Sequence, residues 1–280
     1  MSDHPLLRVE SLTLDYPLPR RSLFQPAPRH RALDGVSLTL ARGESLAVVG
    51  ESGSGKSSLA RAVLALERPT AGRVWLLGRD VYALAPGELR GLRRHAQMVF
   101  QDPYGSLDPR RKVGWIVAEP LDALERGVSR EQRRARIAEV LQSVGMKAGD
   151  AERFPHEFSG GQRQRIAIAR ALITRPDLIV ADEAVSALDV SVQAQVLNLF
   201  MELRETLGLG YLFISHDLAV VRQVADRLVV MRDGKIVEQG GVEAVFRSPQ
   251  HPYTRSLIAA VPRIGVPRHP VTAARPATTP

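Results

Sequence analysis

The chain has 280 residues, of which 44% are hydrophobic and 24% are charged, as in an ordinary globular protein. It contains no cysteine, which excludes disulfides, thiolate zinc sites and cysteine-ligated iron–sulfur clusters. The net charge is +8. Most of this excess of Lys and Arg over Asp and Glu lies in two proline-rich segments without acidic residues, 17–31 and 262–280. These segments predict solvated basic flanks, with attraction to an anionic membrane surface or an acidic partner as the alternative.

The chain has no feature of a membrane-spanning or secreted protein. No apolar run approaches the ~18 residues that a spanning helix requires. Residues 1–5 include an acid and a proline where a signal peptide has a basic end and an apolar run. We therefore expect a soluble cytosolic chain.

Strand patterns recur along most of the chain. The predicted strands are residues 8–16, 36–40, 45–49, 74–77, 96–101, 178–181, 211–215, 228–231 and 236–238. The run at 45–49 is wholly apolar, as expected for a strand that is buried on both faces. Residues 17–31 are expected to be irregular, and residues 232–235 are expected to form a hairpin turn.

Helical patterns alternate with these strands. A helix is predicted at about 56–66, and a longer one carries Val192 and Val196 on an apolar face. Residues 102–160 are charged and helical, and Ser129 with Gln132 forms a capping box there. The alternation predicts an α/β fold with a parallel sheet and a helical insertion near the middle.

The segment that follows the apolar strand fits the pattern G-x-x-x-x-G-K-[ST]. Its residues are Gly50, Glu51, Ser52, Gly53, Ser54, Gly55, Lys56 and Ser57. Glycines let backbone N–H groups converge on phosphate oxygens at the start of a helix. Lys56 would reach the β- and γ-phosphates, and the Ser57 hydroxyl would ligate Mg²⁺. We predict a nucleoside-triphosphate site here, with Ser58 as a further binding residue.

An acidic pair, Asp182 and Glu183, follows the second apolar strand at 178–181. Asp182 would hold Mg²⁺, and Glu183 would polarise the water that attacks the γ-phosphate. An acidic pair after a strand is often only a helix cap. Its combination with the loop at 50–57 favours the catalytic interpretation.

The run Phe-Ser-Gly-Gly-Gln that starts at Phe158 and opens a helix resembles the signature motif of ABC ATPases. A flexible Ser-Gly-Gly linker is the alternative. The resemblance implies that these residues clamp the γ-phosphate of a nucleotide held by the opposite subunit. The residues concerned are Ser159, Gly160, Gly161 and Gln162.

The resemblance extends over about residues 6–261 and assigns several further roles. Gln101 is similar to the Q-loop glutamine, which contacts the metal and senses the transmembrane partner, and residues 186–189 are similar to the D-loop. His216 is similar to the switch histidine that contacts the γ-phosphate. Tyr16 matches the aromatic residue that stacks on adenine, with Phe24 as the rival position. The implied catalytic group is thus Glu183, His216 and Gln101, and the implied metal group is Ser57, Gln101 and Asp182.

The same resemblance implies a domain organisation. It predicts a P-loop NTPase core with a mostly parallel sheet, an N-terminal antiparallel β part and an inserted α-helical subdomain at about 102–160. The ATPase domain would span residues 1–245. Residues 246–280 would form a C-terminal extension and a disordered basic tail.

Within the ABC family, the chain most resembles the ATPases of dipeptide, oligopeptide and nickel importers. The segments that carry this similarity are residues 98–103, 106–110, 155–158, 251–254 and 260–262. Many members continue into a cysteine-bearing iron–sulfur segment, which cannot be transferred to a chain without cysteine. Ala184 stands where most members have proline, a change that nickel-type subunits can also show.

We therefore expect an ATP-hydrolysing subunit of a dipeptide or oligopeptide importer that uses ATP and Mg²⁺. It would lie as a peripheral protein on the cytoplasmic face of the inner membrane. Its expected partners are two transmembrane permeases and a homologous ATPase, or a second copy of itself, in a head-to-tail dimer. An extracytoplasmic solute-binding protein would act with it indirectly, and no nucleic acid is expected.

Alternatives remain open within and outside this class. A nickel or chelated-metal importer, or an exporter, would use the same ATPase chemistry. A DNA-handling ABC ATPase needs a coiled-coil arm of hundreds of residues between the two phosphate-binding motifs, where this chain has only about a hundred. An ABC translation factor usually has two cassettes, and a GTPase needs an Asn-Lys-x-Asp motif that is missing here.

Overall fold

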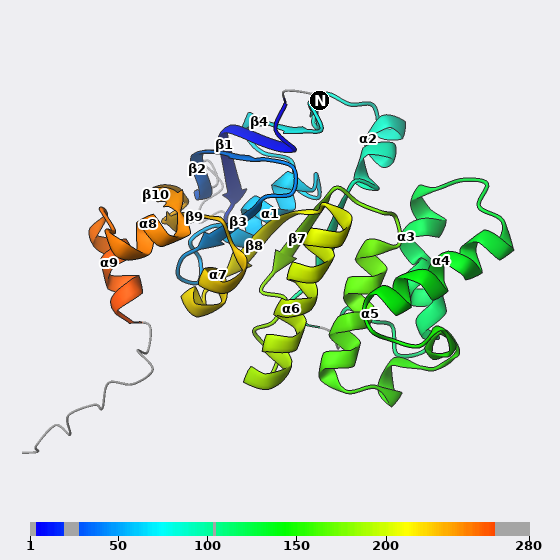
Figure 1. Ribbon diagram of the computed structural model, residues 1–280. Helices are drawn as coiled ribbons and strands as arrows, with labels where there is room; N and C mark the ends of the chain where they lie inside the picture. Colours follow the sequence, from blue (N-terminus) through cyan, green and yellow to red (C-terminus); the bar gives the residue numbers. More distant parts are fainter. Residues whose placement is uncertain (1–3, 20–27, 103–104, 261–280) are drawn as a thin grey trace, which may run out of the picture.

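The computed structural model describes residues 4–19, 28–102 and 105–260. Figure 1 shows two sheets beside a lobe of helices. The smaller sheet is antiparallel, with strand order β2-β1-β4-β5. Its strands are β1 (Leu7–Pro17), β2 (Arg29–Leu40), β4 (Ala71–Leu76) and β5 (Arg79–Asp80). The predicted antiparallel part near the N-terminus is thereby confirmed.

The larger sheet has six strands in the order β10-β9-β3-β8-β7-β6. Five of them run parallel, and β10 pairs antiparallel with β9 after the predicted hairpin turn. The strands are β3 (Ser45–Val49), β6 (Ala96–Val99), β7 (Leu178–Asp182), β8 (Gly210–Ser215), β9 (Arg227–Arg232) and β10 (Lys235–Gly241). The predicted mostly parallel sheet is confirmed.

The core lies on both faces of this larger sheet. Along β3, Ala47 and Val49 belong to one buried hydrophobic cluster, whereas Leu46 and Val48 belong to the other. Side chains of a strand point alternately to opposite faces, so helices or strands must cover both. This double burial is why the sequence at 45–49 is continuously apolar.

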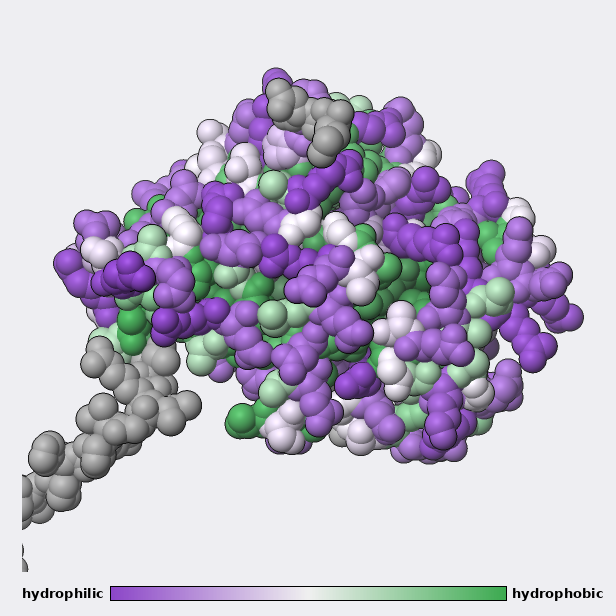
Figure 2. All heavy atoms as spheres, viewed as in Figure 1, coloured by the Kyte–Doolittle hydropathy of each residue, from purple (hydrophilic) through white to green (hydrophobic). Residues whose placement is uncertain are grey.

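Helices follow most strands of the larger sheet. Outside the helical lobe, the helices of the described chain are α1 (Lys56–Val63), α2 (Pro86–Arg93), α6 (Val190–Leu207), α7 (Leu218–Val224), α8 (Val242–Arg247) and α9 (Pro252–Ala259), of which α2 follows β5 of the smaller sheet and α9 follows α8. In the described part of the chain, no helix combines the length and the apolar character needed to cross a membrane. Figure 2 shows the same face of the molecule covered mainly by hydrophilic side chains.

The helical lobe follows β6 in the chain. It contains α3 (Val113–Leu124), α4 (Arg130–Ser143), the short helices η1 (Ala148–Glu152) and η2 (Pro155–Glu157), and α5 (Gly160–Leu172). α3, α4 and α5 pack against one another. The capping box at the start of α4 forms as predicted, since the Ser129 hydroxyl accepts from the N–H of Gln132 and the Gln132 side chain accepts from the N–H of Ser129.

Several predicted boundaries were wrong. β2 begins at Arg29, although residues 29–31 were expected to be irregular, because they pair with β1 and the Arg31 Nε lies 2.9 Å from Asp15 Oδ1. α1 ends at Val63 rather than at about residue 66, since Ala65 has a left-handed φ of 53°. β6 ends at Val99, and α2 was not predicted as a helix.

Candidate functional site

The loop 50–57 joins the buried strand β3 to helix α1. Gly50 has a φ of 156°, and a Cβ atom there would overlap with the carbonyl oxygen of Met231 on β9. Gly55 caps α1 with a φ of 102°, and a Cβ atom there would overlap with the carbonyl oxygen of Ala32. Both glycines are therefore required by backbone conformation and by close packing. The loop lies against β9 and β2 at the end of the central strand.

Lys56 is only 5% exposed and points back into its own loop. Its Nζ donates to the carbonyl oxygens of Gly50 and Glu51, at 2.8 Å in each case. Burial lowers the pKa of Lys56, while the nearby charges of Glu183 and Asp182 act to raise it. The ammonium thus lies within the loop, where the charges of two acidic residues at the end of β7 act on it.

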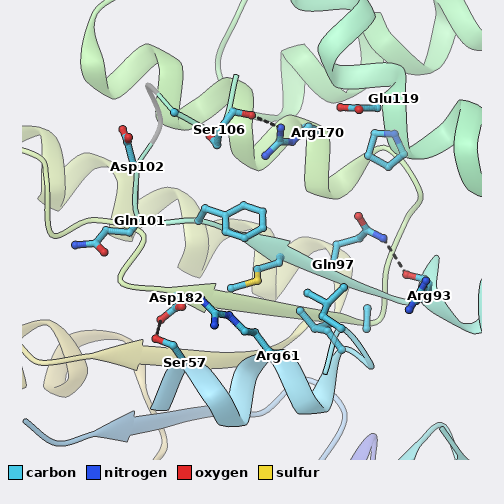
Figure 3. A pocket seen from close by; sticks show the side chains of 17 residues that line it. Ser57, Arg61, Arg93, Gln97, Gln101, Asp102, Ser106, Glu119, Arg170 and Asp182 are labelled. Atoms are coloured by element: carbon cyan, nitrogen blue, oxygen red, sulfur yellow. Dashed lines mark hydrogen bonds between the residues drawn. The ribbon is translucent and has the colours of Figure 1, made fainter. Parts of the chain in front are cut away.

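Ser57 and Asp182 meet across two elements, as Figure 3 shows. The Ser57 hydroxyl on α1 donates to Oδ1 of Asp182, at the end of β7, over 3.3 Å. Burial is the main cause that raises the pKa of Asp182, and the hydrogen bond from Ser57 opposes it. The described residues contain no group of three or more His, Cys, Asp or Glu side chains that could hold a metal by themselves. One hydroxyl and one carboxylate suit Mg²⁺, which usually takes its remaining ligands from phosphates and water.

Glu183 follows Asp182 in an uncommon backbone conformation, with a φ of 50°. Its N–H donates to the carbonyl oxygen of Ile214 on β8, and its Oε2 lies 3.2 Å from Nδ1 of His216. A left-handed conformation in a residue other than glycine costs free energy and is often found at functional sites. Here it directs the carboxylate toward the residue that follows β8.

Gln101 is connected to Glu183 through Ser186. The Gln101 side chain donates to the Ser186 hydroxyl over 3.1 Å, and this hydroxyl donates to the Glu183 carbonyl oxygen over 3.0 Å. The structure therefore brings Gln101, Glu183 and His216 into one connected group, although they lie far apart in the sequence. Gln101 also lines a cleft of about 760 Å³, in which Ser57 and Asp182 lie as well.

Tyr16 lies beside α1, the helix that follows the phosphate loop. Its hydroxyl is 3.2 Å from the Ser58 hydroxyl and donates to Oε2 of Glu67 over 2.6 Å. Ser58, which we predicted to bind nucleotide, is thus in contact with Tyr16. The rival position, Phe24, lies outside the described residues.

The signature residues lie at the start of α5 in the helical lobe, not beside the loop 50–57 on the sheet. The Ser159 hydroxyl accepts from the N–H of Gln162, whose side chain accepts from the N–H of Ser159. Gly160 begins the helix, and a Cβ atom on Gly161 would overlap with Cγ1 of Val192 on α6. Gly161 therefore has a packing role that the sequence motif did not reveal.

Sequence reasoning missed one side chain that contacts the phosphate loop. The Tyr253 hydroxyl on α9 accepts a hydrogen bond from the N–H of Glu51 over 3.0 Å. The available signal was the run His251-Pro252-Tyr253, whose family resemblance gave no indication of this contact.

Comparison with known families gives two matches. Residues 33–186 match a family described as ABC transporter. Residues 237–280 match a family described as the C-terminal region of oligopeptide/dipeptide transporters.

Individual relatives agree with these matches. The chain is 51% identical to the dipeptide transport ATP-binding protein DppF of Escherichia coli K12, over 93% of this chain and 77% of the relative. It is 50% identical to the di/tripeptide transport ATP-binding protein DppF of Pseudomonas aeruginosa, over 92% of this chain and 80% of the relative. Among solved structures, the dimeric ATP-binding cassette MJ0796 bound to ADP and Pi aligns with a TM-score of 0.73 at 31% identity, over 84% of this chain and 98% of that one.

Proposed function

The chain belongs to the ABC transporter family of ATP-binding proteins, and we propose that it drives the import of dipeptides and oligopeptides. It is an ATPase whose hydrolysis is coupled to transport. The observation that carries the peptide assignment is the match of residues 237–280 to the C-terminal region of oligopeptide/dipeptide transporters. The names of relatives at 50% identity and above support the same substrate class.

ATP binding would begin with Lys56. In the structure its ammonium donates to two carbonyl oxygens of the same loop. When phosphate enters, the ammonium would turn to the β- and γ-phosphates, and the N–H groups at the start of α1 would contact phosphate oxygens. Tyr16 beside Ser58 would stack on the adenine ring.

Ser57, Asp182 and Gln101 are the residues that would hold Mg²⁺. A bound Mg²⁺ would neutralise negative charge on the phosphate oxygens. The contact between Ser57 and Asp182 supports this assignment, because it places a hydroxyl and a carboxylate oxygen together at the end of the phosphate loop.

Glu183 would orient and polarise the attacking water, and His216 would contact the γ-phosphate. Their contact of 3.2 Å supports a joint role at the reacting group. The hydrogen bonds through Ser186 connect this pair to Gln101. A movement of Gln101 would therefore be transmitted through Ser186 to the residue that carries the catalytic carboxylate.

A second ATPase subunit would complete each site. Residues 159–162 begin a helix in the lobe, and their N–H groups would contact the γ-phosphate bound to the loop 50–57 of the opposite subunit. Residues 186–189 would cross the dimer interface. The alignment with a dimeric ATP-binding cassette supports this arrangement.

The permeases would dock at the cleft of about 760 Å³ that contains Gln101. Phe100 lines this cleft and is 43% exposed, which offers apolar surface next to the glutamine. Docking here would hold the chain at the cytoplasmic face of the inner membrane as a peripheral protein. A solute-binding protein outside the membrane would deliver the peptide to the permeases.

Affinity purification of the tagged chain from membranes in mild detergent tests this proposal. The wild-type chain and Glu183→Gln should both recover two permeases and an ATPase partner, and only the wild type should hydrolyse ATP. Glu202→Gln, on the exposed surface of α6, is the matched control and should retain hydrolysis. Recovery of ribosomes or DNA without a membrane protein would overturn the transporter assignment.

Uptake by the recovered complex in proteoliposomes then tests the substrate. Uptake of a labelled dipeptide that requires ATP supports the peptide assignment. ATP-dependent uptake of Ni²⁺ without uptake of peptide would replace it.

A further inference from the structure

The described C-terminal helix α9 reaches back to the phosphate loop. The Tyr253 side chain is 7% exposed, and its hydroxyl accepts from the N–H of Glu51 over 3.0 Å. Glu51 is the second residue of the loop. A contact between residues so distant in sequence requires that α9 is held in a defined place.

Hydrogen bonds from β10 hold the start of α9. The carboxylate of Glu238 accepts from the N–H groups of Gln250 and His251, over 2.8 and 3.0 Å. His251 caps the helix, since its Nδ1 accepts from the N–H of Tyr253 over 3.2 Å. The Arg232 guanidinium lies over the Tyr253 ring, 5.0 Å from its centroid. The tyrosine is thus fixed at its backbone and at its ring.

The hydroxyl contacts the peptide unit between Gly50 and Glu51, which Lys56 holds at its carbonyl oxygen. Lys56 binds the carbonyl oxygens of Gly50 and Glu51, whereas Tyr253 binds the N–H of Glu51. If Lys56 turns to a phosphate, those two carbonyl oxygens lose their ammonium partner. The bond to Tyr253 can persist through this change and keep the first peptide units of the loop in position.

We propose that Tyr253 is a positioning residue through which α9 holds the phosphate loop in the conformation that binds ATP. The proposal rests on the loop 50–57 being the nucleotide site. It assigns the C-terminal region of this chain a role in ATP affinity, in addition to its value as a mark of the peptide-importer group.

The Tyr253→Phe substitution tests the proposal, since it removes the hydroxyl and keeps the buried ring. A single hydrogen bond contributes about 0.5–1.5 kcal/mol, which corresponds to a roughly 2- to 12-fold loss of affinity. We expect the Kd for a fluorescent ATP analogue and the KM for ATP to rise in that range, with kcat nearly unchanged. If Tyr253→Phe leaves both KM and Kd unchanged, whether or not its Tm falls, the proposal is overturned.

Tyr211→Phe is the matched control. The Tyr211 hydroxyl is buried in the core of the described structure and has no hydrogen-bond partner there. Its removal should leave the KM for ATP unchanged and should not lower Tm. An equal rise of KM in both variants would overturn the assignment to Tyr253.

A second variant tests the path through β10. Glu238→Ala removes the acceptor that holds the start of α9, so it should raise the KM for ATP as Tyr253→Phe does. The double variant Tyr253→Phe/Glu238→Ala should have a KM no higher than that of Glu238→Ala alone, because both changes break the same connection. Fully multiplicative effects would contradict a shared path.

Lys56→Ala separates this inference from the proposed function. If the wild type binds the ATP analogue and Lys56→Ala does not, the loop is the nucleotide site. Wild-type affinity in Tyr253→Phe would then overturn only the role of Tyr253. If Lys56→Ala binds as well as the wild type, the proposed site itself is wrong.

Discussion

Nδ1 of His216 lies 3.2 Å from Oε2 of Glu183, although the two residues follow different strands of the larger sheet. β7 and β8 are neighbours in parallel pairing, so the segments after them emerge at the same edge. The pairing register places Asp182 beside Ile214, and the carbonyl of Ile214 accepts the N–H of Glu183. The topology of the sheet therefore creates this pair of side chains.

Substituting either member of the pair should slow hydrolysis. Loss of a positioned acid or base lowers the rate by about 10²- to 10⁴-fold, so we expect a kcat reduction in this range for Glu183→Gln. The glutamine retains the shape of the side chain, so ATP binding should persist. Turnover assays and binding of a fluorescent ATP analogue measure both quantities, with Glu202→Gln as the control.

Because the two residues act together, their effects should not multiply. The double variant Glu183→Gln/His216→Ala should be about as slow as the slower single variant. A rate equal to the product of the two single losses would show that they act independently.

Asp182 is predicted to reduce the stability of the protein in the absence of Mg²⁺ and nucleotide. Burial raises its pKa, so its charged form is less favourable in the folded protein than in the unfolded chain. This penalty is absent below the ordinary pKa and is fully present above the raised one. Asp182→Asn should therefore raise Tm at neutral pH, and the gain should shrink as the pH falls toward the carboxyl pKa.

The same variant should lose Mg²⁺-dependent hydrolysis, because an amide is a weaker metal ligand than a carboxylate. Asp233→Asn is the matched control for charge, since Asp233 lies exposed in the turn between β9 and β10. Thermal unfolding across a pH series compares the two variants. A lower Tm for Asp182→Asn at neutral pH would contradict the expected sign.

Local sequence signals predicted the loop 50–57, because adjacent residues build it, whereas Gln101 and His216 were assigned to the site only by the resemblance to ABC ATPases. The loop 50–57 follows directly from its glycines and the flanking apolar strand, and Ser129 forms its capping box within four residues. Contacts across long separations left no such signal. The bond between Glu51 and Tyr253 spans 202 positions, and the strand at 29–31 depends on its pairing with β1. Gly161 matched a motif, while its contact with Val192 depends on how two helices pack.

Tyr16 should contribute to nucleotide affinity through its ring. Stacking of a base on an aromatic side chain contributes about 1–3 kcal/mol, so Tyr16→Ala should weaken ATP binding by roughly 5- to 150-fold. Tyr16→Phe loses the hydrogen bond to Glu67 and keeps the ring, so it should bind ATP nearly as well as the wild type. Titration with ATP measures the effect. If Phe24→Ala loses affinity and Tyr16→Ala does not, the stacking role belongs to Phe24.

Gly161 should be required for the packing of α5 against α6. An alanine methyl group would overlap with Cγ1 of Val192, so the Val192 side chain or one of the two helices must shift. Overpacking of this kind costs about 1–3 kcal/mol, and we expect Gly161→Ala to lower the free energy of unfolding by this amount. Chemical denaturation measures the change.

Removing the opposing methyl groups should relieve the strain. The double variant Gly161→Ala/Val192→Ala is expected to be more stable than the sum of the two single effects predicts, since the new methyl group then has space. Gly149→Ala, at a position where a Cβ atom meets nothing within 4 Å, is the control and should change stability little. Strictly additive effects of Gly161→Ala and Val192→Ala would show that the contact with Val192 does not require glycine. Glycine at this position would then be needed only to let phosphate approach the backbone.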